Sequence, residues 1–179
     1  MSLSNEDQTF LKTYDDSKYA KPSVTADMVI FSRFSDGSLQ VLLIRRGKSP
    51  YKDQFALPGG FVNPDESVDQ AARRELLEET GVDCACLEPI RTFSTPGRDP
   101  RRWVISCAYL ALLDASKLQV KAADDAKDAH WFQIFLTKEK DGQWNLDLKD
   151  TSSTEIGLSS PGFTMPAARS RAASPGICV

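Results

Sequence analysis

Three glutamates, Glu75, Glu78 and Glu79, stand close together in the stretch Arg-Arg-Glu-Leu-Leu-Glu-Glu-Thr-Gly. Their spacing of i, i+3 and i+4 places the three carboxylates on one face if the stretch is helical. Like charges on one helix face repel each other and lower the stability of the helix. Such a face is suited to a bound cation, and carboxylate oxygens are ligands that Mg²⁺ or Mn²⁺ prefers. The spacing therefore predicts a divalent-metal site.

The glutamates belong to a longer series of regularly spaced residues. The series runs from Gly60 through Glu66, Arg74-Glu75-Leu76 and Glu78-Glu79 to Gly81-Val82. A solvated acidic face with an ion pair such as Arg74–Glu78 is the general alternative for a run of charges. That alternative explains neither the glycines nor the spacing, so we favour the metal site.

This series resembles the signature of the Nudix hydrolases, G-x5-E-x7-R-E-U-x-E-E-x-G-U with U aliphatic, and every fixed position is filled. Nudix enzymes hydrolyse a nucleoside diphosphate linked to another moiety. The resemblance implies an α/β fold, a Nudix-type α/β/α sandwich with a mixed β-sheet, and a catalytic cleft at the motif's loop and helix. Divalent cations held by carboxylates can stabilise the negative charge that develops when a pyrophosphate is hydrolysed.

The resemblance also implies roles for individual residues. The expected metal ligands are the Gly59 carbonyl, Glu75, Glu78 and Glu79, and the cofactor is Mg²⁺ or Mn²⁺. Glu78, Glu79 and Arg74 are expected to be catalytic, with Arg74 orienting the carboxylates through charge-assisted hydrogen bonds. Gly60 is expected to lie against the substrate, and Glu66 to support the loop.

The general base is expected outside the motif, as in many relatives. The candidates are Asp124, Asp125 and Asp128, of which Asp125 is assigned to the predicted catalytic residues. A motif glutamate could equally serve, and each aspartate could instead belong to an exposed acidic loop. His130 is the only histidine, and at the start of a predicted strand it is better explained by a structural role.

The segment 94–103 gives the best indication of the substrate. Arg98, Arg101 and Arg102 bring positive charge to it, and arginine binds phosphate in a fork geometry. Together with Arg45-Arg46 and the Leu-Pro-Gly-Gly-Phe segment, it resembles the ADP-ribose pyrophosphatase-like Nudix proteins of bacteria. The resemblance implies hydrolysis of ADP-ribose to AMP and ribose 5-phosphate, with Arg45, Arg46, Arg98 and Arg101 as substrate-binding residues. No aromatic pair can be assigned to the base.

Two alternatives stay open. One is a Nudix hydrolase of another nucleotide, such as an oxidised nucleoside triphosphate, a dinucleoside polyphosphate or NADH. The other is a non-catalytic regulator that senses ADP-ribose. Relatives commonly have glycine at the position of Arg102 and finish with a helix bearing an Asp-His pair, and the sequence departs from both patterns.

The elements that must position the motif can be read from periodicity and turn residues. Strands are predicted at 24–34, 39–46, 87–93, 104–113, 130–136 and 144–148. Asp36-Gly37 and Asp141-Gly142 each predict a hairpin turn. The motif helix is predicted to begin after Ser67, which forms a capping box with Gln70, and to stop at Gly81.

The chain of 179 residues is long enough for one domain with a proper core. The expected division is a polar N-terminal arm at 1–22, a Nudix hydrolase domain at 23–149 and a poorly ordered tail at 150–179. The net charge of −3 argues against a nucleic-acid surface, and no apolar run is long enough for a membrane span. No secretion signal is evident, so a cytoplasmic location with reduced cysteines is expected. Many family members form homodimers, and a polar arm could be exchanged across such an interface.

Overall fold

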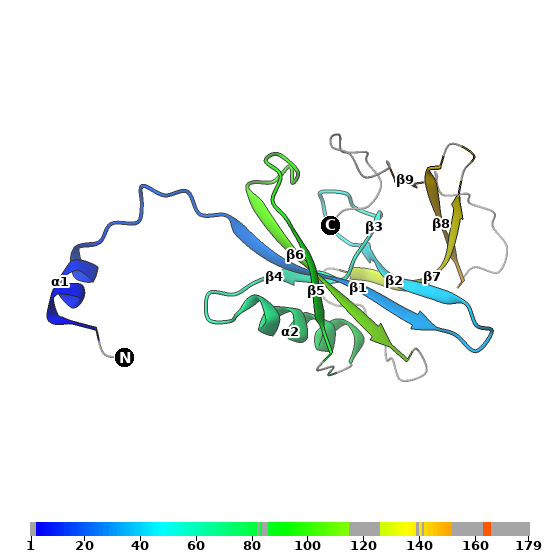
Figure 1. Cartoon of the computed structure of the whole chain (residues 1–179), viewed down its shortest axis with the longest axis horizontal. Helices are drawn as coiled ribbons and strands as arrows, with labels where there is room; N and C mark the ends of the chain where they lie inside the picture. Colours follow the sequence, from blue (N-terminus) through cyan, green and yellow to red (C-terminus); the bar gives the residue numbers. More distant parts are fainter. Residues whose placement is uncertain are drawn as a thin grey trace.

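The computed structural model describes residues 3–81, 83, 86–114, 126–138, 140, 142–151 and 163–165. Its centre is one mixed sheet with the strand order β5-β6-β1-β2-β7-β8-β9. The strands of this path are β1 (Ser23–Arg33), β2 (Leu39–Arg46), β5 (Glu88–Phe93), β6 (Val104–Leu113), β7 (Ala126–Lys138), β8 (Trp144–Asp150) and β9 (Phe163–Met165). The pairing of β1 with β6 is parallel and the other pairings are antiparallel. The predicted mixed sheet and α/β class are therefore confirmed (Figure 1).

The predicted strands are found with small shifts at their ends. The Asp36-Gly37 hairpin joins β1 to β2, with Arg33 opposite Leu39, and Gly37 adopts a positive φ of 84°. The predicted strand at 130–136 is longer, because β7 begins at Ala126 and ends at Lys138. Two short strands, β3 (Phe55–Ala56) and β4 (Gly59–Phe61), pair with β2 and β1 respectively. They carry the chain into the motif.

Helix α2 (Val68–Thr80) begins and ends where the capping residues predict. The Ser67 N–H donates to the Gln70 side chain at 2.7 Å, and the Gln70 N–H donates to the Ser67 hydroxyl at 3.2 Å. Gly81 ends the helix in the left-handed conformation, with φ 73°, and its N–H donates to the Leu77 carbonyl. Caps at both ends fix the length of the helix and therefore the positions of its glutamates.

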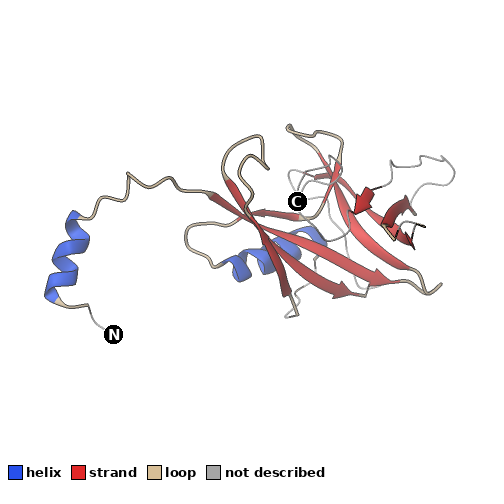
Figure 2. Cartoon of the chain, turned by 45° about the horizontal axis from the view of Figure 1, so that its top comes forward, coloured by secondary structure: helices blue, strands red, loops and turns tan. Residues whose placement is uncertain are grey.

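The core is divided between the two faces of the sheet. On one face Ala71, Ala72 and Leu76 of α2 pack against Met28 and Ile30 of β1. Figure 2 shows α2 lying along this face (Figure 2). The opposite face carries a smaller cluster around Val41, Leu43 and Phe132. Since side chains alternate along a strand, odd-numbered residues of β1 such as Thr25 and Asp27 lie on the face opposite α2.

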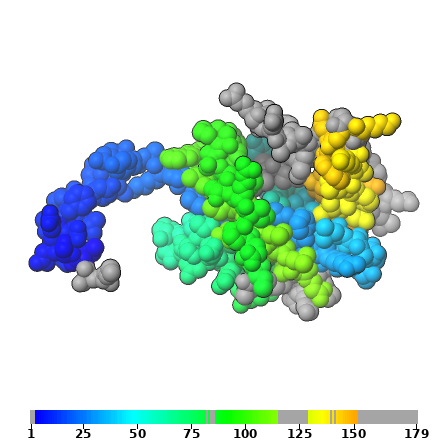
Figure 3. Space-filling model, viewed as in Figure 1, coloured from blue at the N-terminus to red at the C-terminus, as the bar shows by residue number. Residues whose placement is uncertain are grey.

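The N-terminal arm contains a helix that the sequence analysis missed. Helix α1 (Asn5–Thr13) has a capping box in which the Ser4 hydroxyl accepts from the Asp7 N–H. None of its residues is buried, and α1 stands apart from the sheet on an extended linker (Figures 1 and 3). Ser4-x-x-Asp7 was the available signal. Among the helices of the described residues, none is long and apolar enough to cross a membrane.

The division between domain and tail stays a prediction, with two details added by the structure. Strand β8 ends at Asp150, and the Thr151 N–H donates to the Trp131 carbonyl at 3.1 Å. Strand β9 lies within the predicted tail and pairs with β8. The other tail residues, 152–162 and 166–179, lie outside the described part of the chain.

Candidate active site around the Gly59–Thr80 segment

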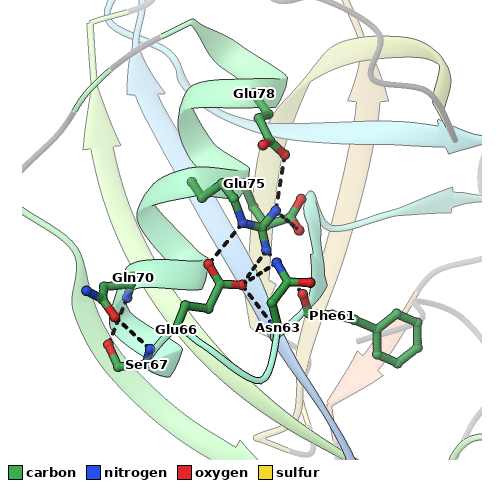
Figure 4. Close-up of polar contacts among 8 residues, drawn as sticks. Phe61, Asn63, Glu66, Ser67, Gln70, Glu75 and Glu78 are labelled. Carbon is green, nitrogen blue, oxygen red and sulfur yellow. Dashed lines mark hydrogen bonds and ion pairs between the residues drawn. The ribbon is translucent and has the colours of Figure 1, made fainter.

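The Arg74 guanidinium connects the loop before α2 with the glutamates on the helix. Figure 4 shows its carboxylate partners Glu66, Glu75 and Glu78 close together. Its Nε and Nη2 donate to the two carboxylate oxygens of Glu66 at 3.0 and 2.7 Å. Its Nη1 donates to Glu75 at 2.7 Å and to Glu78 at 3.1 Å, and Nη2 also donates to the Phe61 carbonyl at 3.1 Å. One guanidinium thus fixes three carboxylates and the end of β4, as bidentate arginine contacts can.

Glu66 supports the loop in the manner expected from the sequence. Its carboxylate accepts from the Asn63 N–H and the Asn63 side chain, both at 2.9 Å, in addition to Arg74. The hydrogen bond from Arg74, followed by that from Asn63, lowers the pKa of Glu66 to about 2. Glu66 is therefore ionised at all ordinary pH values and its oxygens are occupied by the protein.

Glu75 lies against Gly60. A Cβ atom at residue 60 would overlap the Glu75 carboxylate, so only glycine leaves room for this carboxylate over β4. Burial raises the pKa of Glu75, and its ion pair with Arg74 opposes this shift. Gly60 therefore has a steric role beside the helix.

Glu79 is the most deeply placed of the three motif glutamates. Only 5% of its surface is exposed, and the Gly59 N–H donates to its carboxylate. Its Oε2 atom has no hydrogen-bond partner in the described part of the chain. Burial, followed by the nearby Glu75 carboxylate, raises the pKa of Glu79 to about 8. Among the described residues, the buried Oε2 atom therefore lacks a hydrogen-bond donor or cation that would compensate for burial and for the neighbouring carboxylate.

Gly59 adopts a conformation that suits glycine. Its φ is +147°, and a Cβ atom there would meet the Ala26 carbonyl and lie 2.7 Å from the Asp27 Cα. Substitution at Gly59 would therefore be strained and crowded. The close packing places the Gly59 peptide between Glu79 and strand β1.

Glu78 is positioned differently from the other two. Its side chain is 54% exposed and its carboxylate is turned to Arg74. Across the described residues, no three His, Cys, Asp or Glu side chains converge closely enough to hold a metal ion. The pair Glu75 and Glu79 fits a cation best, because these carboxylates interact with each other, both are largely buried, and Glu79 Oε2 has no hydrogen-bond partner among the described residues.

Residues 21–150 match the family described as NUDIX domain, which is most of the chain. The protein belongs to this family. It is 40% identical over 116 residues to the ADP-ribose pyrophosphatase of Methanocaldococcus jannaschii, covering 65% of this chain and 64% of that protein. It is 42% identical over 117 residues to the ADPR responsive transcriptional repressor NtrR of Acinetobacter baylyi, covering 64% of this chain and 46% of the repressor. The Nudix chain thus spans less than two thirds of either relative.

Solved structures of Nudix proteins have a similar fold. A MutT/nudix family protein from Enterococcus faecalis superposes with a TM-score of 0.69 at 34% identity, covering 88% of this chain and 63% of that one. The NUDIX domain of Shewanella oneidensis NrtR, solved in complex with ADP ribose, superposes with a TM-score of 0.61 at 31% identity. That match covers 72% of this chain and 82% of the NrtR domain. The Nudix fold inferred from the motif is confirmed.

A polar network next to the Nudix motif was not foreseen from the sequence. The Thr25 hydroxyl donates to Asp27 at 2.8 Å and shares a hydrogen bond of 2.8 Å with the Ser106 hydroxyl. Arg98 Nη2 donates to the Ser106 hydroxyl at 2.5 Å. Burial raises the pKa of Asp27, and hydrogen bonds from Thr25 and Ser106 oppose the shift. An aspartate within an otherwise apolar strand run was the available signal.

Arg98 and Arg101, both predicted to bind substrate, have different surroundings. Arg98 reaches inward to Ser106, and its buried Nε has no hydrogen-bond partner within the described residues. Arg101 Nε and Nη2 donate to the Asp99 carboxylate at 3.0 and 2.7 Å. The Arg101 guanidinium also lies over the Phe61 ring, with 5.3 Å between Cζ and the ring centroid. The loop 94–103 therefore covers the face of the sheet opposite α2.

Arg45 and Arg46 brace the loop between β2 and β3. Arg45 Nε donates to the Asp53 carbonyl at 3.3 Å, and Arg46 Nε donates to the Pro50 carbonyl at 3.0 Å. Both arginines thus have a local structural task, and their binding of substrate stays a prediction.

The general base remains a prediction as well. Asp124 and Asp125 lie outside the described residues, and Asp128 belongs to β7. His130 pairs with Asp150, with 3.1 Å between Nδ1 and the carboxylate, and its ring contacts Phe55 edge to face. These contacts explain His130 as part of the packing between β7 and its neighbours.

Proposed function

We propose that this Nudix protein hydrolyses the pyrophosphate bond of ADP-ribose in the presence of a divalent cation, with AMP and ribose 5-phosphate as products. The observation that carries the proposal is the buried Glu79 carboxylate, whose Oε2 has no partner among the residues that the structure describes and which lies beside Glu75. The ADP-ribose pyrophosphatase of M. jannaschii, at 40% identity, supports the choice of substrate.

Glu75 and Glu79 would hold the cation, which we expect to be Mg²⁺ or Mn²⁺, with the Gly59 carbonyl and Glu78 as further ligands. When bound, a divalent cation neutralises the charge of the pyrophosphate oxygens and favours nucleophilic attack at phosphorus. Arg74 keeps Glu75 and Glu78 in place through its hydrogen bonds of 2.7 and 3.1 Å. This prior fixation reduces the reorganisation needed when substrate binds.

The substrate diphosphate would lie between the glutamates and the loop 94–103. Arg98 is held near Asp27 and Ser106, where its positive charge can attract a phosphate group. In the reaction, the water oxygen becomes bonded to one phosphorus and the bridging oxygen leaves with the other. A carboxylate, either a motif glutamate or Asp125, accepts the proton of the water.

A substrate panel tests the proposal. The purified protein is incubated with ADP-ribose, NADH, a dinucleoside polyphosphate and an oxidised nucleoside triphosphate, with Mg²⁺ or with excess EDTA. We expect the highest kcat/KM for ADP-ribose and a loss of turnover in EDTA. A higher kcat/KM for another nucleotide would mean that ADP-ribose is not the preferred substrate. Turnover that persists in EDTA would contradict the role of the cation.

A second candidate is a regulator that senses ADP-ribose without hydrolysing it. The 42% identity to the ADPR responsive repressor NtrR favours it. The complete set of Glu75, Glu78, Glu79 and Arg74 favours the hydrolase instead. Tight binding of ADP-ribose without turnover in either divalent cation would support the regulator.

A further inference from the structure

A row of side chains crosses the face of the sheet opposite α2. Phe61 of β4 is the antiparallel partner of Thr25, and Thr25 is the parallel partner of Ser106. Because paired residues in a sheet point to the same face, Phe61 lies on the same side as Thr25 and Ser106. Figure 4 shows its ring extending away from the Glu75 and Glu78 carboxylates (Figure 4). Gly60 and Phe61 thus face opposite sides of β4.

The Arg101 guanidinium is held in a fixed plane above Phe61. Its Nε and Nη2 are occupied by Asp99, which also accepts from the Arg101 N–H at 2.9 Å. A guanidinium whose donor edge is occupied in this way can still offer its flat face to a π-system. Arg101 is therefore better suited to stacking than to the phosphate contact expected from the sequence.

Phe61 keeps 46% of its surface exposed, although it directly follows the motif glycine Gly60. Phe55 and Tyr109 pack in the two core clusters, whereas Trp103 at the end of the loop 94–103 is 48% exposed. Of these aromatic side chains, Phe61 is the one with an arginine guanidinium over its ring. An exposed ring beside a fixed guanidinium, one residue after the motif glycine, suits a flat, aromatic ligand group.

We propose that Phe61 and Arg101 form the stacking site for the nucleobase of the substrate. The proposal rests on the proposed function, because it places the base of that same nucleotide. Phe61 on β4 and Arg98, bound to Ser106 on β6, lie on two strands separated by β1, which is about 10 Å across the sheet. That separation allows the base to stack at Phe61 while a phosphate group reaches Arg98.

Equilibrium binding of AMP and of ribose 5-phosphate tests the stacking site, since AMP carries a base and ribose 5-phosphate does not. Titration calorimetry would compare the wild type, Phe61→Leu and Phe61→Tyr. We expect Phe61→Leu to weaken AMP binding about tenfold, with ribose 5-phosphate unchanged, and Phe61→Tyr to stay within about threefold of the wild type. Tyr19→Leu removes an aromatic ring with its own cation contact, from Lys18, on the linker, and serves as the matched control.

Unchanged AMP binding in Phe61→Leu would overturn the proposal, as would an equal loss of both ligands or no binding of AMP by the wild type. Failure of the proposed function is separable, because it is measured as turnover. If the wild type binds AMP through Phe61 but hydrolyses no substrate, the stacking site is supported and the proposed hydrolase activity is contradicted.

Discussion

Glu79 is buried beside a second carboxylate, and without a bound metal this makes the free energy of unfolding depend on pH. Its pKa rises from 4.5 to about 8 in the folded protein. The folded protein therefore keeps a proton that the unfolded chain loses above pH 4.5, so the stability linked to Glu79 falls as the pH rises toward 8.

The first prediction concerns Glu79→Gln, which removes this titration. In EDTA, the variant should be more stable than the wild type by roughly 2–4 kcal/mol at about pH 9, with the difference shrinking as the pH falls to about 4. Urea unfolding across this pH range measures the difference. A stability difference that does not change with pH would contradict the assigned environment of Glu79.

The second prediction concerns Gly60→Ala. The added methyl group would overlap the Glu75 carboxylate and displace it, so kcat should fall roughly 10- to 100-fold. Gly37→Ala is the matched control, because no atom lies within 4 Å of its added Cβ and only backbone strain is introduced. It should lose some stability while kcat is unchanged. Equal kcat for Gly60→Ala and the wild type would show that catalysis does not depend on the position of the Glu75 carboxylate over β4.

The loop 94–103 depends on strands β1 and β6 for its position. The third prediction is that Ser106→Ala raises KM about three- to tenfold while kcat stays within about twofold, because Arg98 loses its hydrogen bond to the sheet. Steady-state kinetics with ADP-ribose measure both parameters. Ser32→Ala, a fully buried serine farther along β1, is the control for a merely structural effect and should leave KM unchanged. A rise in KM in both variants would contradict the specific role of Ser106.

At the level of elements, local signals were sufficient where the relevant contacts are local. The capping box of Ser67 and Gln70, the stop at Gly81 and the Asp36-Gly37 turn depend on neighbouring residues, so α2 and the first hairpin could be predicted. The network of Thr25, Ser106 and Arg98 could not, because it requires the parallel pairing of β1 with β6, and Thr25 and Ser106 are 81 positions apart in the sequence. Helix α1 was missed although Ser4 and Asp7 supplied a signal.

Within the described part of the chain, a Nudix sheet with α2 packed against it is joined to the N-terminal helix α1, which has no buried residue. The fourth prediction is that removal of residues 1–20 changes the free energy of unfolding by less than about 0.5 kcal/mol, since no residue of α1 is buried. Denaturant unfolding of the truncated chain measures this. A clear loss of stability would mean that the exposed Phe10, Leu11 and Tyr14 pack against the protein in solution.

The molecule as a whole brings the motif glutamates and the loop arginines to β1 and β4 from different parts of the chain. The motif was sufficient to predict the family and the helix that carries the three glutamates, whereas the cation ligands stay a prediction. The Arg74–Glu78 ion pair was considered from the i,i+4 spacing and is present at 3.1 Å. The sequence did not indicate that Asp99 engages Arg101, because that contact depends on how the loop 94–103 packs.

Product analysis of ADP-ribose hydrolysis by the wild type and Glu79→Gln tests the central claim most directly. With Mg²⁺, the wild type should release AMP and ribose 5-phosphate in equal amounts, as resolved by anion-exchange chromatography. Glu79→Gln should reduce the rate by at least about 100-fold while remaining folded. Equal rates for the two proteins would contradict the claim that Glu79 is part of the site that cleaves the pyrophosphate.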